Sequence, residues 1–260
     1  MSQNATLPAE HTSFTPRARP NPTRLFYVAA AVIVLALTFI GFHHFYLYGK
    51  SYPGRDITPP IRTLIISHGI AMSGWLVLFL LQPLLVASGN RRVHMALGKL
   101  GAIYATAIFI LGVCVAVQSA RVSPPDMKLW GLLPKQFMAV PLIAVIIFAL
   151  FVAVGVWQRK RPAIHRPMML LATLSVLSAA VSRIDFINNL YVGTLWESLF
   201  GPFFATLILG ALLLLAKCAL TRSFDKWFTI GLGAQTLAFA LTMQLATTPL
   251  WDHFASALVH

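Results

Sequence analysis

The chain has 260 residues, of which 58% are hydrophobic and only 10% are charged. Soluble domains carry about 25% charged residues, so the composition excludes a water-soluble enzyme, a disordered protein and a disulfide-stapled secreted module. It predicts an all-α, polytopic membrane protein. The two cysteines, Cys114 and Cys218, have no CxxC spacing and predict no disulfide framework.

The positive charge of the chain has a specific meaning in this context. Lys and Arg number 20 against 7 Asp and Glu, a formal net charge of +13. In a soluble chain this surplus would indicate nucleic-acid binding. Here the basic residues cluster between apolar runs, where they fix the orientation of membrane proteins. The predicted partners are therefore the lipid bilayer and anionic headgroups at basic cytoplasmic loops, not nucleic acid.

The N-terminal segment, residues 1–24, is polar and contains four prolines, which predicts a flexible cytoplasmic tail. The apolar run that begins at Leu25 is longer than the core of a cleaved signal peptide, and no small-residue cleavage site follows it. We interpret this run as a retained first helix.

Seven apolar runs are long enough to cross a bilayer, which takes about 20 residues. They cover residues 25–45, 63–87, 100–120, 136–158, 168–190, 197–216 and 227–247. Together they predict a bundle of about seven transmembrane helices over residues 25–247, followed by a short external tail at 248–260. The fifth run contains Arg183 and Asp185, so the alternative is a helix that ends before them.

The basic residues on alternate sides of the predicted bundle indicate its orientation. Thirteen lie in the N-terminal tail or at the second, fourth and sixth loops, and seven lie on the other side. The positive-inside rule then places the N-terminus in the cytoplasm and the C-terminus outside. Receptors coupled to G proteins have the opposite orientation, and a retinal protein needs a lysine that the run 227–247 lacks. Both classes are excluded.

Ionisable side chains near the outer side are the first functional candidates, because burying one in a bilayer costs at least ~2.5 kcal/mol. Arg183 and Asp185 lie near the outer end of the fifth run. His43 and His44 close the first run, and His68 enters the second run from the same side. The short loop between these runs predicts that the three histidines meet, as ligands of a metal ion.

A second pair of histidines is predicted on the cytoplasmic side. His94 and His165 each follow arginines and each open a helix that runs from inside to outside. On the second run, His68, Trp75 and Gln82 recur every seven residues and share one face, which is expected to face the bundle.

The leading functional hypothesis is a membrane redox or metal-handling protein that binds haem b or a transition metal near each membrane face. Neutral imidazole is a good ligand for iron and copper, and two histidines on facing helices can hold a haem. Arg183 would suit a haem propionate and Asp185 would orient an imidazole. The cofactor-binding candidates are His43, His44, His68, His94, His165, Arg183 and Asp185, and the metal candidates are His43, His44 and His68.

Three other interpretations stay open. The histidines would be interfacial hydrogen-bonding groups that help to bind lipid headgroups. Alternatively, the protein would be a proton-coupled small-solute transporter with a path formed by His68, Gln82, Arg183 and Asp185. In the third, it would be a structural or assembly subunit of a membrane complex. A membrane redox partner or homo-oligomer fits these cases, and no nucleotide-binding or nucleophile motif assigns an enzyme activity.

Two short motifs resemble a group of uncharacterised bacterial membrane proteins. His68-Gly69, Trp75, Gln82, Val93-His94 and Leu97-Gly98 match the group's "HG…W…Q…HRxLG" pattern. The segment 162–172, PAIHRPMMLLA, is similar to its later "H-R-x-M-L-L-A" element. The match covers roughly residues 40–190 and departs at Met95, where the group usually has arginine. The resemblance implies a multi-pass protein of the bacterial cytoplasmic (inner) membrane and implies no activity.

Overall fold

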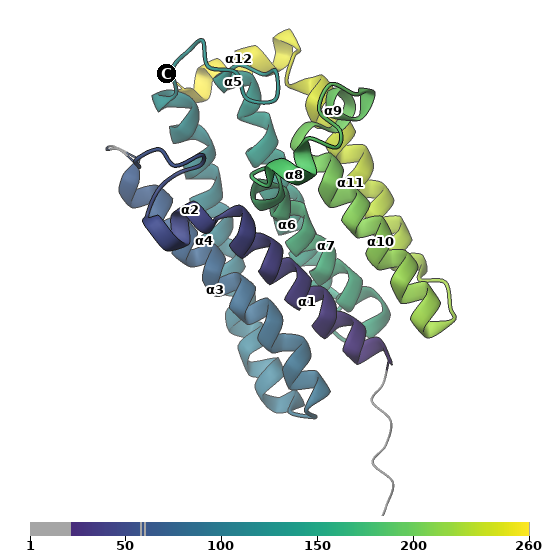
Figure 1. The fold of residues 1–260 in the computed structure, drawn as a ribbon. Helices are drawn as coiled ribbons and strands as arrows, with labels where there is room; N and C mark the ends of the chain where they lie inside the picture. Colours follow the sequence, from purple (N-terminus) through teal and green to yellow (C-terminus); the bar gives the residue numbers. More distant parts are fainter. Residues whose placement is uncertain (1–21, 58, 60, 260) are drawn as a thin grey trace, which may run out of the picture.

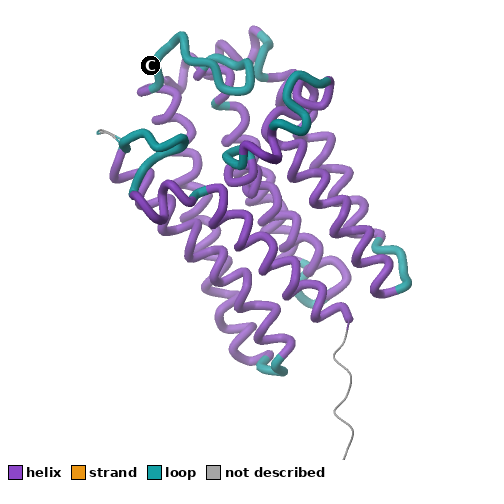
Figure 2. The backbone as a smooth tube through the Cα atoms, viewed as in Figure 1, coloured by secondary structure: helices purple, strands orange, loops and turns teal. Residues whose placement is uncertain are grey.

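The computed structural model describes residues 22–57, 59 and 61–259. This part of the chain is helical and has no β-strand (Figures 1 and 2). Most of the predicted tail, residues 1–21, lies outside the described residues, and its last three residues begin the first helix.

Seven helical segments are long and apolar enough to cross a membrane, as predicted. They are α1 (Pro22–Gly41), α3 (Arg62–Ala87), α4 (Arg91–Val122), α5 with α6 (Pro134–Phe137, Ala139–Trp157), α7 (Pro162–Val181), α9 with the 3-10 turn η1 and α10 (Leu195–Phe200, Gly201–Phe203, Phe204–Thr221), and α11 (Lys226–Leu245). Three shorter helices lie outside these spans: α2 (His43–Tyr48), α8 (Asp185–Asn188) and α12 (Pro249–Val259).

Helix α7 is the centre of the bundle. It packs against α1, α6, α10 and α11, and most of its residues are buried. Alanines and serines along α7 let its neighbours approach closely. The closest approach is to α1 at Gly41, where a Cβ atom would collide with the backbone carbonyl of Ala180.

Short turns make consecutive helices antiparallel, so the bundle has two distinct ends. Asn90 and Asp225 cap the N-termini of α4 and α11 by accepting hydrogen bonds from Val93 N and Phe228 N, and proline occupies the first position of α7. We call the end that contains the turns 88–90, 158–161 and 222–225 the basic end, and the other the opposite end (Figure 1).

The two ends differ strongly in charge. Among the described residues, the basic end carries eleven basic residues and one acidic residue, whereas the opposite end carries seven and five. The basic residues of the basic end are Arg24, Arg91, Arg92, Lys99, Arg159, Lys160, Arg161, Arg166, Lys217, Arg222 and Lys226. The asymmetry predicted from the loops is therefore a property of the folded bundle.

Three predicted segments differ in detail from the structure. The first run breaks at Phe42, whose backbone leaves the helical conformation, and His43 and His44 belong to the separate helix α2. The fifth helix ends at Val181, so Arg183 and Asp185 follow it rather than lie within it. The predicted external tail is not a simple tail, because α12 packs there through a hydrogen bond from Trp251 Nε1 to the Lys135 carbonyl (2.9 Å).

Candidate functional site

His94 and His165 lie side by side at the basic end. His94 is the fourth residue of α4 and His165 is the fourth residue of α7. Both helices begin at the basic end, so the two rings lie at the same end of the bundle. Their ring centroids are 6.4 Å apart and their planes are nearly perpendicular, at 85°. The structure thus brings together two imidazoles that lie 71 residues apart in the sequence.

The orientation of His165 is fixed by the backbone of α6. Its Nδ1 lies 2.8 Å from the carbonyl oxygen of Gly155. Because a carbonyl only accepts, Nδ1 carries the hydrogen, and the lone pair of the neutral ring is on Nε2. Gly155 is a glycine because Met168 and Met169 press against this point of α6. His165 therefore offers Nε2 as a ligand or a proton acceptor.

Gln82 connects the end of α3 to the start of α4 and orients His94. In the orientation that satisfies both ends of its amide, the nitrogen donates to Nδ1 and to the carbonyl of His94 (3.3 Å to the carbonyl), and the oxygen accepts from Gly98 N (3.1 Å). In this state Nδ1 of His94 accepts a hydrogen bond and Nε2 carries the hydrogen. The two histidines therefore have complementary tautomers: Nε2 of His94 carries a hydrogen and Nε2 of His165 carries a lone pair.

Arginines surround the histidine pair in the sequence. Arg166 follows His165 directly, and Arg91 and Arg92 open the helix that carries His94. Positive charge next to an imidazole favours its neutral form. It also attracts anionic groups such as carboxylates and phosphates. We call His94, His165, Gln82 and Gly155 the inner histidine site.

The predicted face of α3 points into the bundle. Trp75 is buried and its Nε1 donates to Thr173 Oγ1 on α7 (3.2 Å), while Gln82 contacts α4 as described. His68, two heptads before Gln82, has a buried Nδ1 for which no described residue offers a hydrogen-bond partner. Its ring lies against α4 near Gly112.

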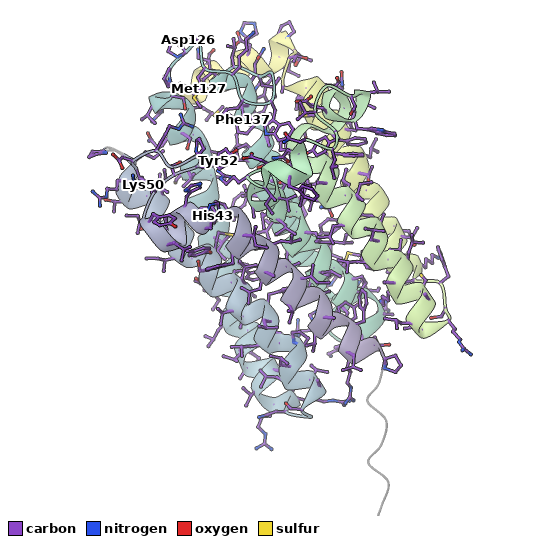
Figure 3. The ribbon with its side chains drawn as sticks, viewed as in Figure 1. His43, Lys50, Tyr52, Asp126, Met127 and Phe137 are labelled. Carbon is purple, nitrogen blue, oxygen red and sulfur yellow. The ribbon has the colours of Figure 1, made fainter. Side chains whose placement is uncertain are left out.

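The outer histidines only partly come together. His43 and His44 have ring centroids 4.1 Å apart, and His43 Nδ1 lies 2.7 Å from the Ile40 carbonyl. Figure 3 places His43 and Tyr52 towards the opposite end of the bundle. Among the described residues, no three or more His, Cys, Asp or Glu side chains are grouped closely enough to hold a metal ion, so His68 does not complete a three-histidine site with His43 and His44.

Arg183 and Asp185 lie at the opposite end, away from the inner histidine site. The Arg183 guanidinium donates to the Ala179 carbonyl and stacks 4.7 Å from the centre of the Phe42 ring. Loss of hydration lowers its pKa to about 10, so it is still charged at neutral pH. Asp185 accepts a hydrogen bond from the Tyr52 hydroxyl, which raises the pKa of Tyr52 above its ordinary value.

These contacts assign Arg183 and Asp185 to loop packing. Arg183 covers the end of α1 at Phe42, and Asp185 fixes the loop that carries Tyr52. His44 lies 6.3 Å from the Tyr52 ring, so it borders this cluster. Within the described part of the chain, the hydrogen bonds of Arg183 and Asp185 go to Ala179 and Tyr52 and not to a histidine.

Sequence reasoning missed a buried charged group at the basic end. Lys217 is only 7% exposed and pairs with Asp225, the cap of α11. It also donates to the Tyr27 hydroxyl on α1 (2.7 Å). The available signal was the segment Cys218-Ala219-Leu220, which extends the helix one turn beyond the lysine and places the lysine inside the bundle.

Comparison with known proteins assigns no family to the chain. The chain matches no family model, and searches of curated proteins and of solved structures find no match. Seven helices of membrane-spanning length and composition are consistent with a multi-pass integral membrane protein whose helices contact the lipid bilayer.

Proposed function

We propose that the protein is a membrane redox or metal-handling protein that binds haem iron or a transition metal ion between His94 and His165. The observation that carries the proposal is the placement of two neutral-capable imidazoles from different helices with centroids 6.4 Å apart. A metal–nitrogen bond is about 2 Å long and the ring adds roughly 1 Å on each side. Two imidazoles on opposite sides of one metal ion therefore have about this separation.

The hydrogen bond of His165 fits a metal ligand, whereas His94 needs a change of tautomer. Metal-binding histidines usually donate their second ring nitrogen to a carbonyl or a carboxylate, and His165 does so to Gly155. For His94 to bind through Nε2, its hydrogen must move to Nδ1. Rotating the Gln82 amide by half a turn then puts its oxygen at Nδ1 as the acceptor, at the loss of its hydrogen bonds to the Gly98 N–H and the His94 carbonyl.

The donor set limits what the site can bind. Among the described residues no group of three or more His, Cys, Asp or Glu side chains could hold a metal ion, so His94 and His165 would hold a haem iron or a copper ion as an imidazole pair. The arginines at this end, Arg91, Arg92, Arg161 and Arg166, would pair with haem propionates. A bound iron or copper would take up one electron from a reduced membrane partner and pass it to an oxidised one.

The test is an absorption spectrum of the full-length protein purified in detergent, oxidised and then reduced with dithionite, with elemental analysis of the same sample. A Soret band that sharpens on reduction indicates haem, and stoichiometric copper, iron or zinc without this band indicates a bare metal ion. The variants His94→Ala and His165→Ala should each lose the bound species. His253→Ala, at an exposed position on α12, is the matched control and should retain it.

A colourless and metal-free protein, purified from cells supplied with iron, copper and haem precursors, contradicts the proposal. Retention of the full cofactor content by both histidine variants would also contradict it, and would move attention to His43, His44 and His68. The His68→Ala variant tests that outer site in the same assay.

A proton-coupled small-solute carrier is the second candidate, favoured by the complementary tautomers of the inner histidine site. A ring with a free N–H beside a ring with a free lone pair can pass one proton between them. Of the path residues expected from the sequence, Gln82 lies at the basic end, whereas Arg183 and Asp185 lie at the opposite end. This candidate predicts proton-dependent flux in proteoliposomes, lost in His94→Ala, with no cofactor in the wild type.

Orientation and location belong to the same proposal. The charge asymmetry of the two ends supports a cytoplasmic basic end, with the N-terminus inside and the C-terminus outside. The membrane would be the bacterial cytoplasmic membrane, and the basic end would contact anionic headgroups. The inner histidine site would then face a redox partner, or a second copy of the chain, from the cytoplasmic side.

A further inference from the structure

Two polar side chains in the middle of the bundle have an oxygen atom that no described residue satisfies. Thr206 on α10 and Gln235 on α11 are each only 1% exposed. No described residue offers a hydrogen-bond partner to Thr206 Oγ1 or to Gln235 Oε1. An unpaired buried polar group costs about 1–3 kcal/mol, so two such oxygens in one bundle require an explanation.

The packing of α10 against α11 places these two side chains at the same level. Phe203 and Phe239 stack with ring centroids 3.8 Å apart on one side of them. On the other side, Gly210 faces Leu232, and a Cβ at Gly210 would lie 2.8 Å from Leu232 Cδ1. Thr206 is three residues after Phe203 on α10, and Gln235 is three residues after Leu232 on α11. Residues three, four and seven apart share a helix face, so both lie between these two contacts, where α10 and α11 meet α7.

The local backbone explains why Thr206 does not satisfy itself. Other buried threonines in these helices donate to the carbonyl four residues earlier, as Thr38 does to Val34 (2.9 Å) and Thr242 does to Ala238 (2.7 Å). The residues before Thr206 form the 3-10 turn η1, whose carbonyls have a different direction. Its hydroxyl therefore stays available to another molecule.

We propose that Thr206 and Gln235 bind a single water molecule near mid-depth in the bundle. The water donates one hydrogen bond to Gln235 Oε1 and exchanges another with the Thr206 hydroxyl. Buried waters form two to four such bonds to otherwise unsatisfied groups. The aromatic stack lies on the side of the opposite end and Leu232 on the side of the basic end.

X-ray radiolytic footprinting of the full-length protein in detergent tests this assignment. Millisecond pulses generate hydroxyl radicals from bound water, which oxidise neighbouring side chains even where bulk solvent is absent. Phe203 and Phe239 should be modified several-fold faster than Phe148, which is equally buried (0% exposed) but packs against Trp75 in an apolar cluster. Equal, low modification of the three phenylalanines overturns the proposal.

Variants then assign the water to these two side chains. In the Thr206→Val, Gln235→Leu double variant, modification of Phe203 and Phe239 should fall to the level of Phe148. The control is Gln244→Leu, which removes an exposed glutamine from the same helix and should leave the pattern unchanged. Unchanged modification of Phe203 and Phe239 in the double variant would show that the water lies elsewhere.

Discussion

Gln82 acts on the inner histidine site without being a ligand. Its amide bonds to His94 and to Gly98 N, so it fixes the first turns of α4 relative to the end of α3. An amide can present either its nitrogen or its oxygen to Nδ1 of His94 and so can pair with either tautomer of that ring, but only the first orientation also accepts from Gly98 N. Leucine can form none of these hydrogen bonds, and an ionised glutamate has no N–H to donate to Nδ1.

We expect Gln82→Leu to reduce the affinity of the inner histidine site for its metal or haem about 10- to 100-fold, as the loss of a hydrogen bond to a ligating histidine usually does. The protein should still fold, because Gln82 lies at the helix end. Titration of the cofactor-depleted protein, followed by the Soret or charge-transfer absorption, measures the effect. Gln244→Leu is the matched control, and an unaltered affinity in Gln82→Leu would remove Gln82 from the site.

The buried ion pair between Lys217 and Asp225 is expected to make a large contribution to the stability of the basic end. Lys217 bonds to Asp225 and Tyr27 while almost fully buried. Breaking one side of such a pair leaves a buried charge and typically costs about 3–5 kcal/mol. We expect Asp225→Ala to lower the unfolding temperature in detergent markedly, and the double variant Lys217→Met, Asp225→Ala to recover part of the loss. A double variant less stable than Asp225→Ala would contradict this view.

At the scale of the elements, the close crossing of α1 and α7 requires a residue without a side chain at position 41. Gly41 allows the two backbones to touch, and a methyl group there would overlap the Ala180 carbonyl. We expect Gly41→Ala to destabilise the bundle by about 1–3 kcal/mol or more, as overpacking does. Gly233→Ala is the control, because a Cβ at Gly233 meets open space. It should be neutral or stabilising, since alanine favours a helix. Thermal unfolding in detergent compares the two.

The loop after α2 is held to α8 by a hydrogen bond that depends on pH. The bond to Asp185 raises the pKa of Tyr52 above the unfolded value of about 10. A raised pKa means that this contact is fully present below the unfolded value and is lost as pH rises through the folded one. A nitroxide at Ser51→Cys, in a chain without Cys114 and Cys218, should therefore gain mobility only above pH about 10. Tyr52→Phe should give high mobility at every pH, and a transition near neutral pH would contradict the assignment.

The sequence predicted the elements better than their contacts. Seven apolar runs define seven helices because hydrocarbon thickness sets a minimum length. The pairing of His94 with His165 also followed, because both begin helices that start at the same end. The expected meeting of His68 with His43 and His44 depended on the rotation of α3 and on a continuous first helix. The break at Phe42 changes the direction of His43 and His44, and no hydropathy pattern reveals such a break.

The polar groups inside the bundle were less predictable for a related reason. Thr206 is an ordinary residue of an apolar run and Gln235 was considered only as a possible member of a polar path, whereas the packing of α10 on α11 around them comes from the structure alone. The sequence left open whether Arg183 and Asp185 lie within the fifth helix or after it, and the structure shows the second case, because the helix ends at Val181 with Ser182 as its C-cap. Helix rotation and end points come from side-chain packing, which a single sequence constrains weakly.

At the scale of the whole molecule, charge separates the two ends, and the acidic residues add to the asymmetry of the basic ones. Eleven basic residues face one acidic residue at the basic end, against seven and five at the other. With the basic end in the cytoplasm, each Lys or Arg near anionic lipid adds about 1 kcal/mol of attraction.

Orientation can be read directly with single cysteines in a chain without Cys114 and Cys218. Ser88→Cys lies in the turn at the basic end and Ser123→Cys follows α4 at the opposite end. We expect an impermeant maleimide to label Ser123→Cys in intact cells and to label Ser88→Cys only after permeabilisation, because basic loops remain on the cytoplasmic side. The reverse pattern would invert the proposed topology.

The length of α4 has a practical consequence. Its 32 residues span about 48 Å, whereas the hydrocarbon core measures about 30 Å. At the opposite end Arg121 bonds to the backbone carbonyls of Leu258 and Val259, which ties the last turns of α4 to α12 (Figure 1). An antibody fragment raised against this joined pair of helices would bind a helical surface rather than a loop. Its added mass would allow images of a 28.5 kDa membrane protein to be aligned in electron micrographs.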